Sequence, residues 1–314
     1  MIIIRLMGGL GNQLQQYSLY RKFISLGKEA KLDEIWFSND VQKNMKAPRK
    51  KEIDLFTGVK YETCTDRERK LLTGGDDVFS KALRKLKLIS NKVYTEHTMY
   101  DPGIFDLEDS YLTGYFACEN YYADIIDELK KELVLPHKER LDTVVSDIQI
   151  GTGSCGSGEN KSVKTCSVHI RRGDYLDPVN APTFGNICTD AYYDSAVKYA
   201  IEKGAGRFFV FSEDKEYSLN YVKRLEDSYG VKAVYVDENH GDDSCYDIYL
   251  MSLCDMNICA NSTFSFWGAR LNDNISKVMI RPTVQRNNQD FVEENMKKWW
   301  KNWVFIDKEG KVFD

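Results

Sequence analysis

One short stretch of the chain gathers an unusual density of chemically active side chains. An imidazole, two guanidiniums, a carboxylate and a phenol come from His169, Arg171, Arg172, Asp174 and Tyr175. Buried charges are costly unless they are paired, and an anionic ligand would supply the pairing. Paired arginines suit a diphosphate, because each presents a planar fork of donors that stays charged. The stretch therefore indicates an anion site, with a surface ion-pair cluster as the alternative.

Two further polar clusters directly follow apolar runs that we expect to be strands. Their members are Ser212, Glu213, Asp214, Asn261, Ser262 and Thr263. The second cluster precedes a predicted helix, whose first N–H groups would be available to a phosphate. It is equally compatible with an ordinary helix N-cap. Because the carboxyl ends of parallel strands share one edge of a sheet, three clusters at strand ends favour a common ligand site.

A glycine-rich turn opens the chain, after a β-branched strand predicted over residues 1–6 and before a helix predicted over 14–26. The turn contains Gly8, Gly9, Gly11, Asn12 and Gln13. The third glycine of the dinucleotide fingerprint is missing, and no Gly-Lys-Ser/Thr sequence follows. The turn would let backbone approach a ligand closely, with two side-chain amides beside it. A plain strand-to-helix turn is the alternative.

Composition limits the class of protein. The chain has 314 residues, a net charge of −5 and a hydrophobic fraction of 42%, so wholesale nucleic-acid binding is not expected. Its eight cysteines include no CxxC pair and only four histidines are present, which argues against a metal site. The first apolar residues are too few for a signal peptide, and no run is long enough to span a membrane. We expect a cytoplasmic protein with reduced thiols.

Strands and helices are predicted to alternate along the second half of the chain. Apolar strand-like runs lead into polar loops, and the pattern is typical of a doubly wound parallel α/β sheet. A Gly/Ser-rich stretch over residues 151–158 marks the predicted domain junction. We therefore predict domains at 1–155 and 163–285, with an aromatic tail over 286–314 that packs across them.

Taken together, these sequences resemble glycosyltransferase family 11, the α-1,2-fucosyltransferases. The resemblance is carried by residues 8–13, 169–175, 211–214 and 260–269. Each segment is weak evidence alone, whereas the four in this order form a specific pattern over most of the chain. The resemblance implies a GT-B-like α/β architecture, in which two Rossmann-like domains face each other across a cleft.

The activity implied is transfer of L-fucose from GDP-β-L-fucose to the 2-hydroxyl of a terminal galactoside, with inversion. No metal or other cofactor is expected, because arginines would stabilise the leaving diphosphate. The resemblance implies that Arg171 contacts the β-phosphate with Arg172 beside it. His169 and Asp174 are the candidates for a catalytic base, and a structural role for His169 stays open, as does a reaction without a strong base.

The remaining donor-binding candidates come from several segments. Glu213, Asp214 and Asp247 would contact guanine or ribose, whereas Ser212 lies beside them. The other candidates would reach the phosphates or the donor from the glycine-rich turn and the late segment: Gly11, Asn12, Gln13, Asn261, Ser262 and Thr263.

The chain departs from the family pattern at two places. Gln15 stands where the family usually has a phenylalanine, which would alter first-domain packing or acceptor fit, and Met256 stands where a histidine is common. The alternatives to fucosyl transfer are a GT-B transferase that uses another nucleotide sugar, such as GDP-mannose, and a non-catalytic nucleotide- or glycan-binding protein. The acceptor's identity and the oligomeric state are not indicated. A lipid-linked precursor would bring the protein to the inner face of the membrane.

Overall fold

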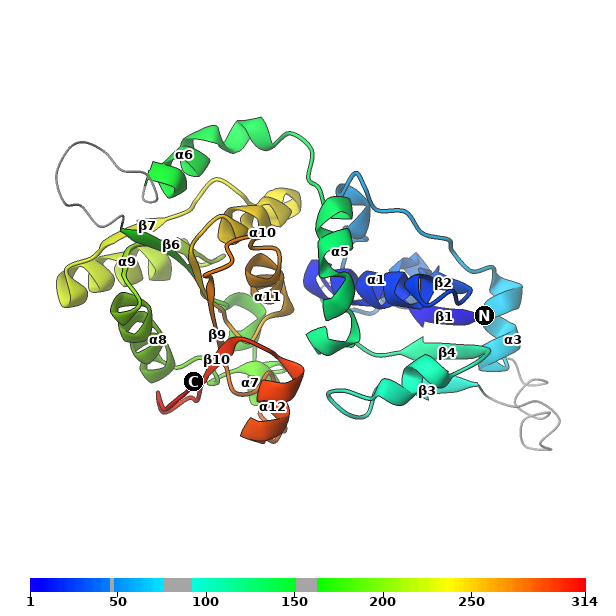
Figure 1. Cartoon of the computed structure of the whole chain (residues 1–314). Helices are drawn as coiled ribbons and strands as arrows, with labels where there is room; N and C mark the ends of the chain where they lie inside the picture. The colour runs from blue at the N-terminus through cyan, green and yellow to red at the C-terminus, as the bar shows by residue number, and fades with distance from the viewer. Residues whose placement is uncertain (46–47, 76–91, 151–162) are drawn as a thin grey trace. The chain divides into compact units, whose positions relative to one another are not determined.

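A computed structural model describes residues 1–45, 48–75, 92–150 and 163–314. The chain forms two compact units, Met1–Val134 and Leu135–Asp314 (Figure 1). The predicted junction stretch lies outside the described residues. Helix α6 (Asp142–Ile150) belongs to the second unit, so the boundary lies about one helix earlier than the sequence indicated.

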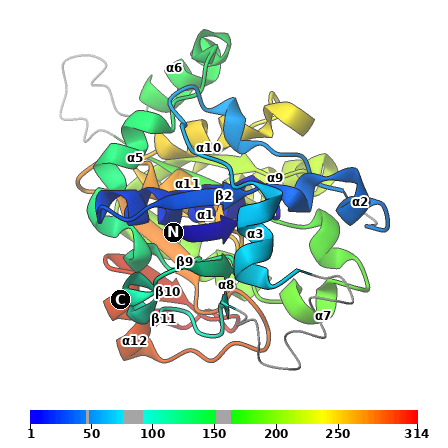
Figure 2. The same ribbon diagram turned by 90° about the vertical axis from the view of Figure 1, so that its right-hand side faces the viewer.

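The first unit is built on a four-stranded parallel sheet in the order β2-β1-β4-β3. Its strands are β1 (Ile2–Arg5), β2 (Ala30–Asp33), β3 (Val93–Thr95) and β4 (Ser110–Thr113). Its α-helices are α1 (Leu10–Ser25), α2 (Asn39–Gln42), α3 (Asp66–Thr73) and α5 (Ile126–Glu132). Helix α1 packs along β1 and β2, as Figure 2 shows. The buried first strand is confirmed.

The glycine-rich turn is shorter than predicted. Helix α1 begins at Leu10, so Gly11, Asn12 and Gln13 lie in its first turn rather than in a loop. The backbone N–H groups of Asn12 and Gln13 both donate to the carbonyl of Gly9, at 2.9 and 3.1 Å. Gly8 makes the sharp turn with a φ of +82°, a conformation that glycine adopts at no steric cost.

The second unit contains a seven-stranded sheet in the order β11-β10-β9-β8-β5-β6-β7, parallel except for the edge strand β11. Counted from β5, its parallel strands follow the doubly wound order 3-2-1-4-5-6. The strands are β5 (Lys164–His169), β6 (Ala205–Phe211), β7 (Lys232–Tyr235), β8 (Met256–Ile258), β9 (Val278–Pro282), β10 (Trp303–Ile306) and β11 (Val312–Phe313).

Side-chain caps start two of the helices that connect these strands. The Thr189 hydroxyl accepts from the N–H of Tyr192 at the start of α8, and Asp214 caps α9 in the same way. The helices after α6 are α7 (Ala181–Phe184), α8 (Asp190–Glu202), α9 (Lys215–Tyr229), α10 (Cys245–Ser252), α11 (Thr263–Arg270) and α12 (Glu293–Trp299).

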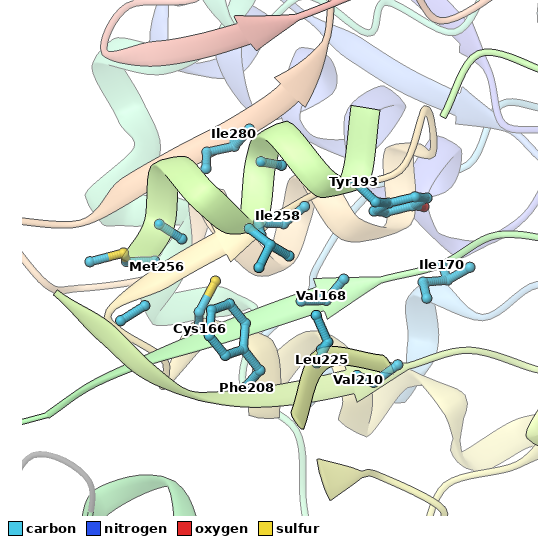
Figure 3. Packing of buried hydrophobic residues seen from close by; sticks show 14 of the residues in the cluster. Cys166, Val168, Ile170, Tyr193, Phe208, Val210, Leu225, Met256, Ile258 and Ile280 are labelled. Carbon is cyan, nitrogen blue, oxygen red and sulfur yellow. The ribbon is translucent and has the colours of Figure 1, made fainter. Parts of the chain in front are cut away.

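One face of the second sheet forms a continuous apolar core against α8 and α9 (Figure 3). Cys166, Val168 and Ile170 of the β5 segment point into this core with Tyr193 of α8 and Leu225 of α9. Since successive strand residues point to opposite faces, the side chain of the buried His169 lies on the other face of the sheet.

The C-terminal segment differs from the prediction of a tail across the domains. Residues Trp303–Ile306 are buried and form β10, which pairs in parallel with β9. Trp300 is fully buried and packs against Phe266 of α11 at 5.4 Å between ring centroids. The aromatic residues therefore complete the second unit's own core.

The predicted α/β class is confirmed, with two units that each contain a parallel sheet, as a GT-B-like chain requires. How the two units face each other stays a prediction. No disulfide joins the cysteines that lie within residues 1–45, 48–75, 92–150 and 163–314. In this part of the chain no helix is long and apolar enough to cross a membrane.

Candidate active site

The polar clusters of the second unit gather at the point where the strand order reverses. Strand β5 lies next to β8, and the chain proceeds from β5 to β6 and β7 on one side, and from β8 to β9 and β10 on the other. Ligands of doubly wound sheets bind outside the carboxyl ends of the strands at this switch point. The Arg171 loop follows β5, and the Asn261 loop follows β8.

Arg171 lies at the centre of this edge. Its Nη2 donates to Oδ1 of Asp174 at 2.6 Å, and its Nη1 lies 3.5 Å from Oε1 of Glu213. Its guanidinium carbon is 5.6 Å from the ring centroid of Tyr175. Burial acts to lower the pKa of Arg171, but the charges of Glu213 and Asp174 outweigh it, and the net direction is upward. The guanidinium is therefore charged and held between two carboxylates.

Arg172 is fixed by a different set of contacts. Its Nε donates to Oδ2 of Asp214 at 2.9 Å, and its guanidinium carbon lies 3.9 Å from the ring centroid of Tyr217. Asp214 also accepts from the N–H of Tyr217 at 3.0 Å; this bond first, and Arg172 second, lower the pKa of its carboxyl. Asp214 is therefore occupied by a helix cap and an ion pair, so it is a support for Arg172 as well as a predicted donor contact.

The loops that follow β5 and β6 approach each other closely at Gly173. The backbone N–H of Arg172 donates to Oε1 of Glu213 at 3.1 Å. A Cβ atom on Gly173 would lie 2.6 Å from the same oxygen, so any larger residue there would displace the carboxylate. The Ser212 hydroxyl accepts from the N–H of Asp214 at 3.2 Å. This close approach is what holds Glu213 beside Arg171.

Tyr175 joins the two loops of the switch point. Its hydroxyl donates to the backbone carbonyl of Asn261 at 3.1 Å, and its ring stacks on Phe184 with centroids 5.2 Å apart. The Asn261 amide donates to the carbonyls of Phe184 and Gln285, at 3.0 and 3.2 Å, and its Oδ1 accepts a long bond from the thiol of Cys188. The Asn261 side chain thus binds the protein itself, and its contact with phosphate stays a prediction.

Ser262 and Thr263 begin helix α11 at the same edge. Ser262 is the N-cap residue, although its side chain makes no capping bond, and its carbonyl accepts from the Ser265 hydroxyl at 3.1 Å. The predicted helix start is therefore confirmed. A phosphate contact by these two residues stays a prediction.

His169 is buried at the end of β5. Its side chain lies 5.6 Å from Phe264 between ring centroids, and its Nδ1 has no hydrogen-bond partner within the described part of the chain. Burial, and then the charge of Arg171, lower the pKa of His169 to about 3. The imidazole is neutral at physiological pH and a weak base, which argues against the predicted role of His169 as catalytic base.

Asp247 lies on α10 in a desolvated position. Burial raises the pKa of its carboxyl to about 7, against a hydrogen bond of 2.8 Å from the Asn239 amide that acts to lower it. The Tyr235 hydroxyl donates to the Ser212 carbonyl in the β6 loop at 3.1 Å. Burial first, and then Asp237, raise the pKa of Tyr235 to about 12, and the charges of Asp247 and Asp214 add to this rise. A perturbed carboxyl near a ligand edge is a functional candidate.

The glycine-rich turn of the first unit places its predicted site residues differently. The Gln13 side chain donates to the carbonyls of Gly8 and Lys50, at 3.0 and 2.9 Å, and accepts from the N–H groups of Glu52 and Ile53. All four of its hydrogen-bonding positions are used within the fold, and the donor contact of Gln13 stays a prediction. Asn12 is partly exposed, whereas Gly11 is buried in the helix.

Several residues of this site were not predicted from the sequence. Tyr217, Phe184 and Asn239 carry no motif of their own, and each matters through a contact that forms only in the fold. Tyr175 was visible in the opening stretch but had no assigned partner. No group of three or more His, Cys, Asp or Glu side chains that could hold a metal ion occurs in residues 1–45, 48–75, 92–150 and 163–314.

The doubly wound sheet with charged guanidiniums at its switch point defines a protein that binds a phosphorylated, nucleotide-like ligand. The chain belongs to glycosyltransferase family 11, whose family model matches residues 78–307. It is therefore a glycosyltransferase, as the resemblance in its sequence indicated.

The chain is also similar to several individual proteins. The chain is 29% identical over 305 residues to an α-1,2-colitosyltransferase of Escherichia coli, covering 95% of this chain and 97% of the relative. It is 28% identical over 299 residues to the O-antigen biosynthesis glycosyltransferase WbnK of Escherichia coli, covering 88% and 92%. Among solved structures, POFUT1 in complex with GDP matches with a TM-score of 0.44 and 17% identity, covering 88% of this chain and 97% of POFUT1.

Proposed function

We propose that the chain transfers L-fucose from GDP-β-L-fucose to the 2-hydroxyl of a terminal galactoside, with inversion at the anomeric carbon. The observation that carries the proposal is the position of Arg171 at the switch point, between the carboxylates of Asp174 and Glu213. A diphosphate carries more negative charge than either carboxylate and can accept two parallel hydrogen bonds from this guanidinium.

The reaction is one in-line displacement. The bond from the anomeric carbon to the phosphate oxygen breaks as the bond to the acceptor oxygen forms, and GDP leaves with the electron pair. Arg171 stabilises the negative charge that grows on the diphosphate, in a position fixed before the reaction begins. Arg172, held by Asp214 and Tyr217, adds a second positive charge without needing a metal ion.

The acceptor's 2-hydroxyl proton must be removed. Binding of the diphosphate to Arg171 releases Asp174 from its 2.6 Å ion pair, which leaves a carboxylate near the reacting atoms. We assign removal of this proton to Asp174 rather than to His169, because His169 is buried and has a pKa of about 3. His169 then acts as a neutral packing residue at the end of β5.

The remaining donor contacts are proposed from the same edge. Asp247 accepts hydrogen bonds from guanine, because the Asp247 carboxyl is desolvated and one of its oxygens already bonds the Asn239 amide. Glu213 and Ser212 lie nearer the ribose. The N–H groups at the start of α11, at Ser262 and Thr263, bind phosphate oxygens. Gly11 and Asn12 of the first unit are also proposed as donor contacts.

A second candidate donor is GDP-colitose. It is favoured by the relative named as an α-1,2-colitosyltransferase, which matches nearly the whole of this chain. The acceptor proposed for either donor is a galactose-terminated glycan, which a lipid-linked precursor at the inner face of the membrane would supply.

The experiment is a donor screen followed by analysis of the product. GDP-fucose, GDP-colitose, GDP-mannose and UDP-sugars are each supplied with a panel of galactosides, and nucleotide release is measured with and without EDTA. We expect GDP release from GDP-fucose that EDTA leaves unchanged, and an α-1,2 linkage in the product. Release of UDP, another linkage, or no turnover with any galactoside would contradict the proposal.

A further inference from the structure

Helix α1 carries three glutamines that are completely buried: Gln13, Gln15 and Gln16 each have 0% exposure. Two of them are hydrogen-bonded within the fold. Gln13 makes the four hydrogen bonds described above, and Gln16 accepts from the Met7 N–H at 2.8 Å and donates to the Gly114 carbonyl at 2.9 Å. These two side chains fasten the turn after β1 to the neighbouring loops.

Gln15 differs from both neighbours. Neither its Nε2 nor its Oε1 has a hydrogen-bond partner anywhere in residues 1–45, 48–75, 92–150 and 163–314. A buried amide without partners loses its hydration and gains no bond in return, so it destabilises the fold. A hydrophobic residue of similar volume would fill the same space at lower cost. The position is therefore one where stability is sacrificed, as is typical of functional sites.

The direction of the side chain relates Gln15 to the glycine-rich turn. It follows Gly11 and Asn12 by four and three positions, so the three residues share one face of the helix. Helical side chains lean toward the helix N-terminus, which directs the amide toward Asn12 and the turn. The space beside Gly9 is open, because a Cβ atom there would meet no atom within 4 Å. Contact with a ligand requires this turn to shift, and two glycines permit such a shift.

The chemistry of an amide narrows the ligand. It presents one acceptor oxygen and one donor nitrogen on the same end, and it carries no charge. A pair of neighbouring sugar hydroxyls matches it, because each hydroxyl both donates and accepts. We propose that Gln15 is a sugar-binding residue whose amide bonds a hydroxyl pair of a bound substrate. The proposal rests on the proposed function only in requiring that a sugar is bound, from either the donor or the acceptor.

The first arm of the test measures stability. Gln15→Met and Gln15→Leu remove the amide and keep an apolar chain of similar size, and Gln16→Met is the matched control on the same helix. We expect the melting temperature to rise by about 2–4 °C in the Gln15 variants and to fall in Gln16→Met. A fall in both Gln15 variants would show that the amide is satisfied within the fold, and would overturn the proposal.

The second arm measures kinetics with the same variants. We expect kcat/KM to fall on the order of tenfold in Gln15→Met and Gln15→Leu, as the loss of a neutral hydrogen-bonded pair implies. A fall in transfer alone assigns the hydroxyls to the acceptor, whereas an equal fall in donor hydrolysis without acceptor assigns them to the donor sugar. Unchanged kinetics for both reactions would overturn the proposal.

Failure of this proposal is separable from failure of the proposed function. The function is tested on the wild-type chain by the identity of its donor and product linkage. The role of Gln15 is tested by the ratio of variant to wild-type rates with whichever nucleotide sugar the wild type turns over.

Discussion

The Tyr175 hydroxyl donates to the backbone carbonyl of Asn261 across the switch point of the second sheet, at 3.1 Å. The two residues are 86 positions apart and belong to loops that follow adjacent strands, β5 and β8. The same tyrosine ring lies beside the Arg171 guanidinium. One side chain therefore sets both the spacing of the two loops and the position of the arginine between them.

We predict that Tyr175 affects catalysis beyond its contribution to stability. Tyr175→Phe keeps the ring that stacks on Phe184 and loses only the bond to Asn261, which is worth about 1 kcal/mol. We expect a several-fold rise in the donor KM, because the Arg171 loop is no longer fixed to the Asn261 loop. Steady-state kinetics with varied donor check this.

The matched control for Tyr175 is Tyr192→Phe. The Tyr192 hydroxyl also donates to a backbone carbonyl of the β8 segment, that of Cys259 at 2.5 Å, from helix α8 in the apolar core. We expect a similar loss of unfolding free energy with an unchanged donor KM. An equal KM change in both variants would show that Tyr175 acts only through stability.

Arg171 is predicted to be essential, and its geometry matters as much as its charge. Arg171→Ala abolishes transfer while the chain stays folded, because the guanidinium is partly exposed and its partners are surface carboxylates. Arg171→Lys recovers little, since an ammonium cannot make the bidentate contact. We expect kcat to fall by about 10²–10³-fold. Circular dichroism with single-turnover assays distinguishes this from misfolding, and near-normal turnover by Arg171→Lys would refute the bidentate role.

The parts of the fold that were predicted correctly depend on local signals. Apolar runs that lead into polar loops identified β5, β6 and β8. The run at Trp303–Ile306 was missed as a strand, because short aromatic and aliphatic runs suit a helix or a strand equally well. Its assignment depends on pairing with β9, which no local pattern contains.

The site was predictable in its charged groups and not in its connections. The arginines and carboxylates were identified because charge at strand ends has few structural uses. The hydrogen bonds of Gln13 were not predicted, because its partners at residues 50–53 lie some 40 positions away and come together only in the fold. The burial of His169 was not predicted, because its neighbour Phe264 belongs to another element. Distance along the chain, rather than residue chemistry, limited these predictions.

Asp247 is predicted to make the protein less stable as pH rises. The pKa of Asp247 in the folded chain, about 7, lies above its ordinary value, so the folded chain holds this proton more tightly than the unfolded chain. The resulting contribution to stability is present below about pH 4 and is lost as pH rises from about 4 to about 7, by roughly 1.4 kcal/mol per pH unit. Asp247→Asn keeps an acceptor for the Asn239 amide and removes this loss. We therefore expect the variant to be more stable than wild type at pH 8 in denaturant titrations, and to bind GDP more weakly.

Asp243→Asn is the control for Asp247, because Asp243 is an exposed acid near α10 that pairs with Arg140 at 3.1 Å. We expect it to leave the pH dependence of stability between pH 4 and pH 7 unchanged. A wild-type slope retained in Asp247→Asn would place the titrating group elsewhere.

His169 is predicted to act in the opposite direction, in a pH range of its own. Its folded pKa of about 3 lies below the ordinary value of 6.5, so the unfolded chain binds the proton first as pH falls. The contribution to stability is present above pH 6.5 and is lost as pH falls toward 3, by about 1.4 kcal/mol per unit. His169→Phe keeps a ring against Phe264 and cannot titrate. The free energy of unfolding of His169→Phe, measured in denaturant from pH 7 to pH 5, should therefore fall less steeply than that of the wild type. The control is His137→Gln, at an exposed position, which should retain the wild-type dependence on pH. Equal dependence on pH in all three proteins would show that the His169 imidazole is not buried in its neutral form.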